Sequence, residues 1–242
     1  MPWETYQNYF QKFTRMGGIV EEFIDAEIKV SPSAQLRTSP AGEVLPTSTH
    51  DQILGGPSGQ VYQGCSFPAH EDYRLAIQHR SILVGEVLAR KGVVSRFGVD
   101  FLAYKDRAED PWKLTALEIN LRVLGTTHPF LALQFLTGGT LNPETGNFVS
   151  LSGRPKYYMA TDNLRAATYR GVLPEDLIDI VTDNALHYSH RTESGVLFHL
   201  IGALSEYGKL GLTVIASSPE EVEDLYARTL DVLARETGIG HG

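Results

Sequence analysis

The sequence contains one cysteine, no excess of basic residues and no long apolar run. Cys65 has no partner for an internal disulfide, which fits a reducing cytoplasm. A formal net charge of −8 argues against nucleic acid, which would require a basic surface. No run approaches the roughly 20 apolar residues of a membrane helix. The first ten residues, MPWETYQNYF, lack the basic and apolar regions of a signal peptide, so we expect a cytoplasmic protein without a membrane or nucleic-acid partner.

The most informative stretch predicts a β-hairpin in the middle of the chain. Residues 93–105 are rich in Val, Phe, Leu and Tyr, and residues 113–122 alternate apolar and polar side chains. The sequence DRAEDP between them is typical of a turn, whose centre we place near Glu109. Asp100 should then face Glu118 across the hairpin, and Asn120 should share the face of Glu118 because strand side chains alternate. The other face carries Val99, Phe101, Leu117 and Ile119, which we expect to pack on the core.

Two carboxylates and an amide oxygen on one face suit a hard divalent cation. Mg²⁺ takes few protein carboxylates and completes its shell with water and phosphate oxygens. We therefore predict that Asp100, Glu118 and Asn120 are metal ligands. Arg122 extends the same face and could hold a phosphate through two parallel hydrogen bonds. The alternative is that these side chains are ordinary polar residues on a solvated sheet face.

The motifs of this hairpin resemble the metal-binding end of the ATP-grasp superfamily. GVDF, a strand ending in LEINLR, and then GTTHPF are most similar to the carboxylate–amine ligases grouped with the pheganomycin peptide ligase. The resemblance implies that Asp100, Glu118 and Asn120 hold the magnesium ions that bridge the ATP phosphates, with Mn²⁺ as an alternative cation. Many members have an arginine two residues before the aspartate. Gly98 occupies that position here, and Arg96 precedes it by two residues.

The resemblance also implies residues for the nucleotide and for catalysis. IVEEFI at residues 19–24 resembles the hinge strand, whose backbone reads the adenine edge. Adenine would contact Glu21, Glu22, Phe23 and Ile24, and either Asp25 or Glu27 would bind ribose; the alternative is a plain edge strand. Arg122, Arg96 and Arg37 are the candidate catalytic arginines. His128 is a weaker acid or base candidate, because a histidine before proline in a turn is usually structural.

The length of 242 residues allows one or two domains, and the resemblance implies an α+β fold with two. Residues 1–145 resemble the second ATP-grasp lobe, an antiparallel sheet with helices that holds nucleotide and metal. Residues 146–242 resemble the small β-α-β-β-α domain that follows it in the same ligases. The predicted helices are 3–13, 71–91, 131–136, 174–186 and 218–235, and the later strands are 156–164, 196–204 and 210–216.

The resemblance implies an ATP-dependent ligase that joins a carboxylate to an amine through an acyl phosphate. Its partners would be ATP and small carboxylate and amine, amino-acid or peptide substrates. The family's first lobe would lie before Trp3, so we expect a truncated form, a fragment or half of a split enzyme, with a separate chain supplying that lobe. The alternative is a catalytically silent module that binds nucleotide or docks to a partner.

Overall fold

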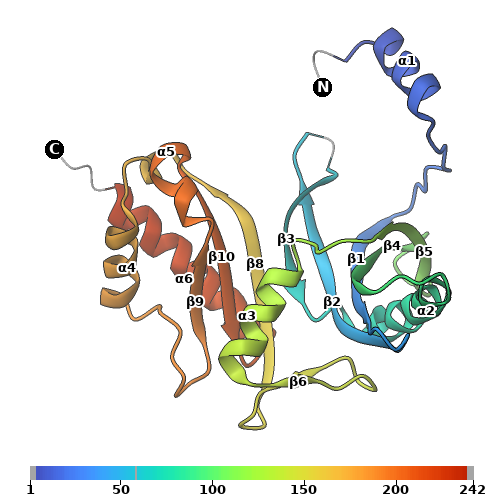
Figure 1. Ribbon diagram of the computed structural model, residues 1–242. Helices are drawn as coiled ribbons and strands as arrows, with labels where there is room; N and C mark the ends of the chain where they lie inside the picture. The colour runs from blue at the N-terminus through green and yellow to red at the C-terminus, as the bar shows by residue number, and fades with distance from the viewer. Residues whose placement is uncertain (1–3, 58, 239–242) are drawn as a thin grey trace.

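The chain folds around one antiparallel sheet, which the computed structural model describes, with its helices, over residues 4–57 and 59–238 (Figure 1). The main path of the sheet runs β5-β4-β1-β2-β3-β8-β10-β9, and the short β6 and β7 lie beside β8. The strands are β1 (Ile28–Thr38), β2 (Val44–Gly55), β3 (Val61–Phe67), β4 (Ser95–Lys105), β5 (Lys113–Asn120), β6 (Thr140–Leu141), β7 (Phe148–Val149), β8 (Pro155–Arg165), β9 (Gly195–His199) and β10 (Lys209–Ala216). The helices are α1 (Tyr6–Met16), α2 (Glu71–Arg90), α3 (Thr127–Thr137), α4 (Pro174–Asp183), α5 (Leu204–Tyr207) and α6 (Pro219–Gly238), with 3-10 turns η1 (Ala167–Tyr169) and η2 (Ile201–Ala203). The predicted α+β class is confirmed.

Helix α2 covers one face of the β1–β2–β4 region. Its Tyr73 and Ile77 are buried with Leu36 of β1 and with Phe97 and Phe101 of β4. Alternation along the strands sends these apolar side chains to the α2 face and leaves the neighbouring polar ones on the opposite face. The helix predicted from the apolar spacing of residues 71–91 is therefore confirmed, and it fixes which face of β4 remains available for polar chemistry.

Helix α3 lies on the opposite face, over the centre of the sheet. Its Phe130 and Leu133 pack with Phe67 of β3 and with Tyr158 and Ala160 of β8. The hydrogen-bonded β3–β8 pair joins the first part of the sheet to the last, so the sheet is continuous from β5 to β9. The polar face of β4 is thus the face that also carries α3.

The last hundred residues follow the predicted β-α-β-β-α order. Strands β8, β10 and β9 are adjacent, and α6 covers them with Val222 and Val232 against Leu212 and Val214. β9 ends at His199, earlier than predicted, because the chain turns through η2 and α5 before β10 begins. α3 likewise begins at Thr127, four residues before its predicted start.

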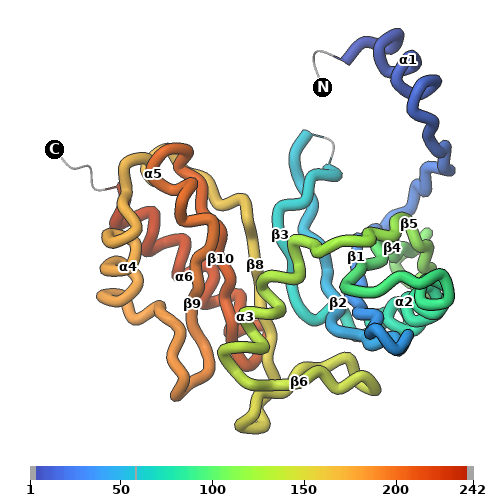
Figure 2. Tube along the Cα trace, in the orientation of Figure 1, coloured from blue at the N-terminus to red at the C-terminus, as the bar shows by residue number. Residues whose placement is uncertain are grey.

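Helix α1 stands apart from the sheet, at the blue end of the chain in Figures 1 and 2. None of its residues is buried, and residues 17–27, which link it to β1, form neither helix nor strand. The predicted strand at residues 19–24 is therefore wrong. Although its pattern is strand-like, a strand requires a neighbouring strand for its N–H and C=O groups, and this segment pairs with none of the described strands.

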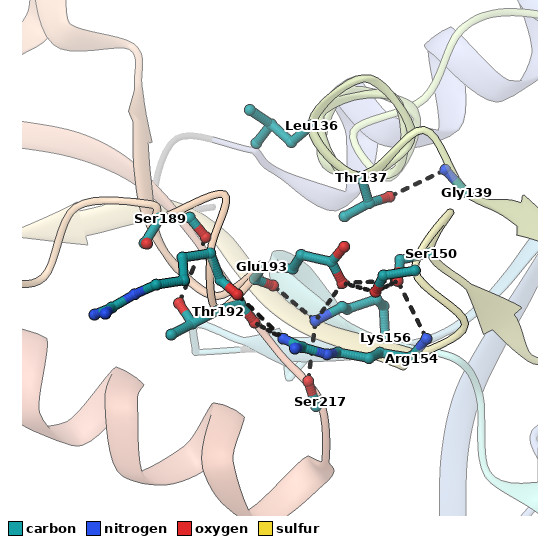
Figure 3. A network of polar contacts seen from close by, with 12 residues as sticks. Leu136, Thr137, Gly139, Ser150, Arg154, Lys156, Ser189, Thr192, Glu193 and Ser217 are labelled. Carbon is teal, nitrogen blue, oxygen red and sulfur yellow. Dashed lines mark hydrogen bonds and ion pairs between the residues drawn. The ribbon is translucent and has the colours of Figure 1, made fainter.

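A buried lysine joins three parts of the C-terminal half (Figure 3). The side chain of Lys156, at the start of β8, is 0% exposed. Its Nζ donates to the backbone oxygen of Glu193 at 2.8 Å and to Oγ of Ser217 at 2.9 Å, and it lies 3.5 Å from a Glu193 carboxylate oxygen. That oxygen also accepts hydrogen bonds from Ser150 and Ser152. The network links the loop before β9 and the end of β10 to the start of β8.

The helices in residues 4–57 and 59–238 are too short or too polar for any of them to traverse a bilayer.

Candidate functional site

The hairpin of β4 and β5 places the three predicted metal ligands on one face. Asp100 is directly opposite Glu118, and Gly98 is opposite Asn120. Nδ2 of Asn120 donates to an Asp100 carboxylate oxygen at 2.9 Å. Because directly opposed side chains in an antiparallel pair project to the same side, the three side chains converge as predicted. Their role as metal ligands remains a prediction.

A β-bulge sets this register. Phe101 is opposite Ala116, whereas Asp100 is opposite Glu118, so Leu117 is the extra residue on β5. Without the bulge, the spacing from the turn would have brought Leu117 opposite Asp100 and sent Glu118 to the other face. The bulge therefore aligns the two carboxylates.

The prediction that Leu117 and Ile119 pack on the core is wrong. Val99 and Phe101 are buried as expected, but Leu117 is 43% exposed and Ile119 is 47% exposed. β5 is the edge strand, and α2 packs against β1, β2 and β4. The apolar side of β5 beyond Leu114 therefore lies outside the cover that α2 provides.

The electrostatics of the cluster favour a cation. Burial and the carboxylate of Glu118 raise the pKa of Asp100, while the side chains of Gln52, Arg122 and Asn120 oppose that rise. Gln52 of β2, which the sequence did not single out, donates to the other Asp100 oxygen at 2.8 Å. Two carboxylates thus face each other with only partial compensation, and a divalent cation between them would relieve their repulsion.

Asp100, Glu118 and Asn120 could hold a metal ion only if other oxygen ligands completed its coordination shell. Within the described residues, no group of three or more His, Cys, Asp or Glu side chains is arranged to hold a metal ion by itself. Two carboxylates and one amide oxygen match the few protein ligands that Mg²⁺ takes when water and phosphate supply the rest. The cluster therefore fits Mg²⁺ together with a nucleotide better than a dedicated protein cage.

The loop after β5 explains the glycine at position 98. A Cβ on Gly98 would lie 2.4 Å from Cδ1 of Leu124 and 2.8 Å from Nε2 of Gln35. The side chain of Leu124, in the loop that leads from Asn120 to α3, therefore lies against β4 at Gly98. A side chain two residues before Asp100 would therefore have to displace the side chains of Leu124 and Gln35.

The three candidate arginines occupy two different places. Arg122 follows β5, and its charge opposes the rise in the pKa of Asp100, while its guanidinium donates to the backbone oxygen of Val123 at 3.3 Å. Arg37 of β1 and Arg96 of β4 are directly opposite each other, four residues along β4 from Asp100. That spacing corresponds to about 13 Å along a strand. Arg37 and Arg96 line a separate pocket, whereas the charge of Arg122 acts on Asp100.

The contacts recorded for the predicted adenine and ribose residues run to Lys29 and not to the Asp100 cluster. Val20 and Phe23 are 89% and 78% exposed. The contacts of this segment run to Lys29, whose Nζ lies 3.8 Å from Asp25 and over the ring of Phe23. Glu21, Glu22, Ile24 and Glu27 lie in the same irregular stretch. Their nucleotide roles remain predictions.

Two histidines lie close together where α3 begins and β9 ends. The rings of His128 on α3 and His199 at the end of β9 are 4.8 Å apart. Burial and the neighbouring His128 lower the pKa of His199 to about 4, against the influence of Asp162. A Cβ at Gly211, the cross-strand partner of His199, would lie 2.3 Å from this ring. Sequence spacing gave no signal for this pair because its members lie 71 residues apart.

Comparison with known families matches two parts of the chain. A model described as IQCH-like, ATP-grasp matches residues 1–144, and one described as PGM1 C-terminal domain matches residues 176–229.

Two curated proteins match most of the chain. An L-propargylglycine–L-glutamate ligase of Streptantibioticus cattleyicolor is 36% identical over 227 residues, which are 94% of this chain and 45% of the ligase. IQ motif-containing protein H of Danio rerio is 21% identical over 239 residues, which are 97% of this chain and 22% of that protein. The chain thus spans less than half the length of either relative.

Solved structures share the fold at low sequence identity. A biotin carboxylase complex from Campylobacter jejuni superposes with a TM-score of 0.61 at 12% identity, over 93% of this chain and 50% of that one. An N5-carboxyaminoimidazole ribonucleotide synthetase from Thermus thermophilus gives 0.56 at 15% identity, over 96% of this chain and 57% of that one. At these identities the likeness concerns the fold alone.

Proposed function

This chain belongs to the IQCH-like ATP-grasp family, and from that premise we propose that it carries the magnesium–nucleotide site of an ATP-dependent carboxylate–amine ligase. The resemblance seen in GVDF, LEINLR and GTTHPF is thereby confirmed at the level of the superfamily. The 36% identity to a ligase that joins L-propargylglycine to L-glutamate supports amide formation between amino acids. Because the chain spans 45% of that ligase, the reaction and its substrates are proposals for this chain.

The observation that carries the proposal is the convergence of Asp100, Glu118 and Asn120. The three lie on adjacent strands, on the polar face of the hairpin, with the carboxylates directly opposed. A bound Mg²⁺, or Mn²⁺ as an alternative, would neutralise charge on the phosphoryl oxygens of ATP. Asp100 and Glu118 would each supply one oxygen and Asn120 its amide oxygen, once its side-chain amide has turned from donating to Asp100.

The proposed reaction needs no covalent intermediate between substrate and enzyme. A carboxylate oxygen of the acid bonds to the γ-phosphorus of ATP while the bond to the β–γ bridging oxygen breaks, which gives an acyl phosphate and ADP. The amine nitrogen then bonds to the acyl carbon, the carbon–oxygen bond to phosphate breaks, and a proton leaves the nitrogen. Arg122, whose charge acts on Asp100, would stabilise charge on the transferring group.

The remaining assignments support the same reaction. We propose Glu21 to Ile24 as adenine contacts, Asp25 or Glu27 as the ribose contact, and Arg96 and Arg37 as binders of an anionic substrate group. We also propose a division near residue 145 between a nucleotide-binding part and a second domain. The matches at 1–144 and 176–229 support that division, although the β3–β8 pair carries the sheet across it.

Magnesium-dependent nucleotide binding is the direct test. Asp100→Asn and Glu118→Gln remove one charge each with little change in size. In calorimetric titration with ATP and Mg²⁺, each should weaken binding at least tenfold, which corresponds to about 1.4 kcal/mol. Titration with ATP and a chelator should show no difference between the variants and the parent.

Glu109→Gln is the matched control, since Glu109 is an exposed carboxylate in the turn of the same hairpin. It should bind the magnesium nucleotide as the parent does. If Asp100→Asn and Glu118→Gln also bind like the parent, the metal assignment is wrong.

A further inference from the structure

The carboxylate of Asp100 is held by two side-chain amides, one on each side of β4. Nε2 of Gln52, on β2, donates to Oδ1 at 2.8 Å, and Nδ2 of Asn120, on β5, donates to Oδ2 at 2.9 Å. Because an ionised carboxylate only accepts hydrogen bonds, the nitrogen of each amide has to face it. The two oxygens of Asp100 are therefore engaged from opposite directions, Oδ1 from β2 and Oδ2 from β5.

Gln52 reaches Asp100 across an intervening strand. β1 lies between β2 and β4, so two strand spacings, about 9–10 Å, separate their backbones. On β1, Ser33 is directly opposite Asp100 and Ser31 is directly opposite Gln52, so these serines share the face on which the hydrogen bond lies. Serine at both places leaves room for a long side chain to lie over β1, and glutamine has the length and the donor that this contact needs.

The two amides would act differently toward a cation. In the proposed metal site, Asn120 turns its amide oxygen to the cation and no longer donates to Asp100. Gln52 is not a proposed ligand, so it can keep its hydrogen bond to Oδ1. The oxygen left to face Glu118 and Asn120 is then Oδ2, and Asp100 offers a cation one oxygen rather than two.

Resting on the proposed magnesium–nucleotide function, we infer that Gln52 is a positioning residue that makes Asp100 a one-oxygen ligand and thereby favours Mg²⁺ over Ca²⁺. Mg²⁺ demands near-ideal octahedral geometry with short bonds, so it gains from a carboxylate whose orientation is fixed. Ca²⁺ accepts about six to eight ligands in flexible geometry and can take both oxygens of one carboxylate. A hydrogen bond that occupies Oδ1 therefore assists the smaller cation and restricts the larger one.

Calorimetric titration with ATP in the presence of Mg²⁺ or of Ca²⁺ tests the inference through the ratio of the two dissociation constants. Gln52→Met keeps the length of the side chain but removes its donor, and Gln52→Asn keeps the amide but is one methylene shorter. Each should weaken binding with Mg²⁺ about tenfold, as the loss of a hydrogen-bond partner behind a metal ligand typically does. Binding with Ca²⁺ should stay within about twofold of the parent or become tighter.

The ratio separates a positioning role from a structural one. If Gln52 only stabilised the fold, its loss would weaken binding with both cations alike and leave the ratio unchanged. Gln63→Met is the matched control, since Gln63 is a half-buried glutamine on the neighbouring strand β3 whose amide contacts Asn163 and the backbone oxygen of Val61. It should keep the ratio of the parent.

Two outcomes distinguish failure of this inference from failure of the proposed function. If Asp100→Asn and Glu118→Gln weaken Mg²⁺-dependent binding while both Gln52 variants keep the cation ratio of the parent, the inference is wrong and the proposed function stands. If binding of ATP with Mg²⁺ is absent or does not depend on Asp100 and Glu118, both are wrong.

Discussion

The Lys156 network and the Asp100 cluster are both polar groups on the sheet, but only one of them is complete. Nζ of Lys156 has three oxygen neighbours, from two residues, and Glu193 in turn accepts from Ser150 and Ser152. The hydrogen bonds from these two serines and the ammonium of Lys156 outweigh burial and lower the pKa of Glu193. Burial lowers the pKa of Lys156, against the influence of Glu193. Opposite charges and donors with acceptors are nevertheless matched there, so the removal of one partner would leave the other unpaired.

The Asp100 cluster has the opposite balance. Two carboxylates face each other, and the side chain of Glu118, an exposed residue, makes no hydrogen bond or ion pair within the described residues. Burial and Glu118 raise the pKa of Asp100. A site that must bind a cation has to keep unneutralised negative charge in its absence. Incomplete pairing, rather than polarity alone, is therefore what sets the proposed metal site apart from the Lys156 network.

The largest effect should follow from breaking the complete network. Lys156→Met leaves the carboxylate of Glu193 without its cation in a mostly buried position. Breaking a buried pair in this way typically costs about 3–5 kcal/mol. Urea unfolding should therefore show a fall of that order in the free energy of unfolding.

Arg154→Met is the matched control for Lys156. Arg154 lies two residues earlier and donates to the backbone oxygen of Thr192, but its side chain is exposed. Its loss should cost less than about 1 kcal/mol. Equal stability of the two variants would show that the Lys156 network contributes little.

The same contrast explains what the sequence could predict. Local patterns located the hairpin, α2 and α6, because alternation and turn residues lie within a short window. The predicted pairing of Asp100 with Glu118 is also observed, but the bulge at Leu117 produces it, and alternation alone does not indicate that bulge. Local patterns could not reveal Lys156, whose partners Glu193 and Ser217 lie 37 and 61 residues away. The motif of the proposed metal site was recognisable because its residues follow one another on two adjacent strands.

The wrong predictions share a physical cause. Leu117 and Ile119 have the pattern of core residues, and residues 19–24 have the pattern of a strand. Burial and strand pairing, however, depend on which neighbour covers an edge. α2 does not extend over β5 beyond Leu114, and no described strand lies beside residues 19–24. A local pattern does not contain that information.

A smaller effect on stability should come from His50, because only one of its two ring nitrogens has a hydrogen-bond partner within the described chain. Its Nε2 lies 2.6 Å from the hydroxyl of Tyr158, while Nδ1 is buried without a partner in the described chain. Burial lowers the pKa of His50 from 6.5 to about 3. The unfolded state therefore takes up a proton as the pH falls through 6.5, the folded state does not until about 3, and stability decreases across that window.

His50→Gln should remove that pH dependence. Between pH 7.5 and pH 5 the parent should lose about 2 kcal/mol from this group, which the variant should not lose. Urea unfolding at both pH values measures the difference, and buried carboxylates affect both proteins equally. Parallel pH profiles for parent and variant would mean that His50 is protonated in the folded protein.

The smallest effect should have the opposite sign and should occur at the incomplete cluster. Glu118→Gln removes one of two directly opposed carboxylates, so without Mg²⁺ it should raise the free energy of unfolding by about 0.5 kcal/mol or less. The gain should disappear in 1 M salt, which screens exposed charges beyond about 3 Å. Glu109→Gln, on the same hairpin but away from Asp100, should show no such gain.

Added Mg²⁺ and ATP should then stabilise the parent and the Glu109 variant but not Glu118→Gln, because ligand binding stabilises only a folded state that binds it. If Glu118→Gln is instead destabilising at low salt, Glu118 has a structural partner, and the contrast between the two clusters does not hold.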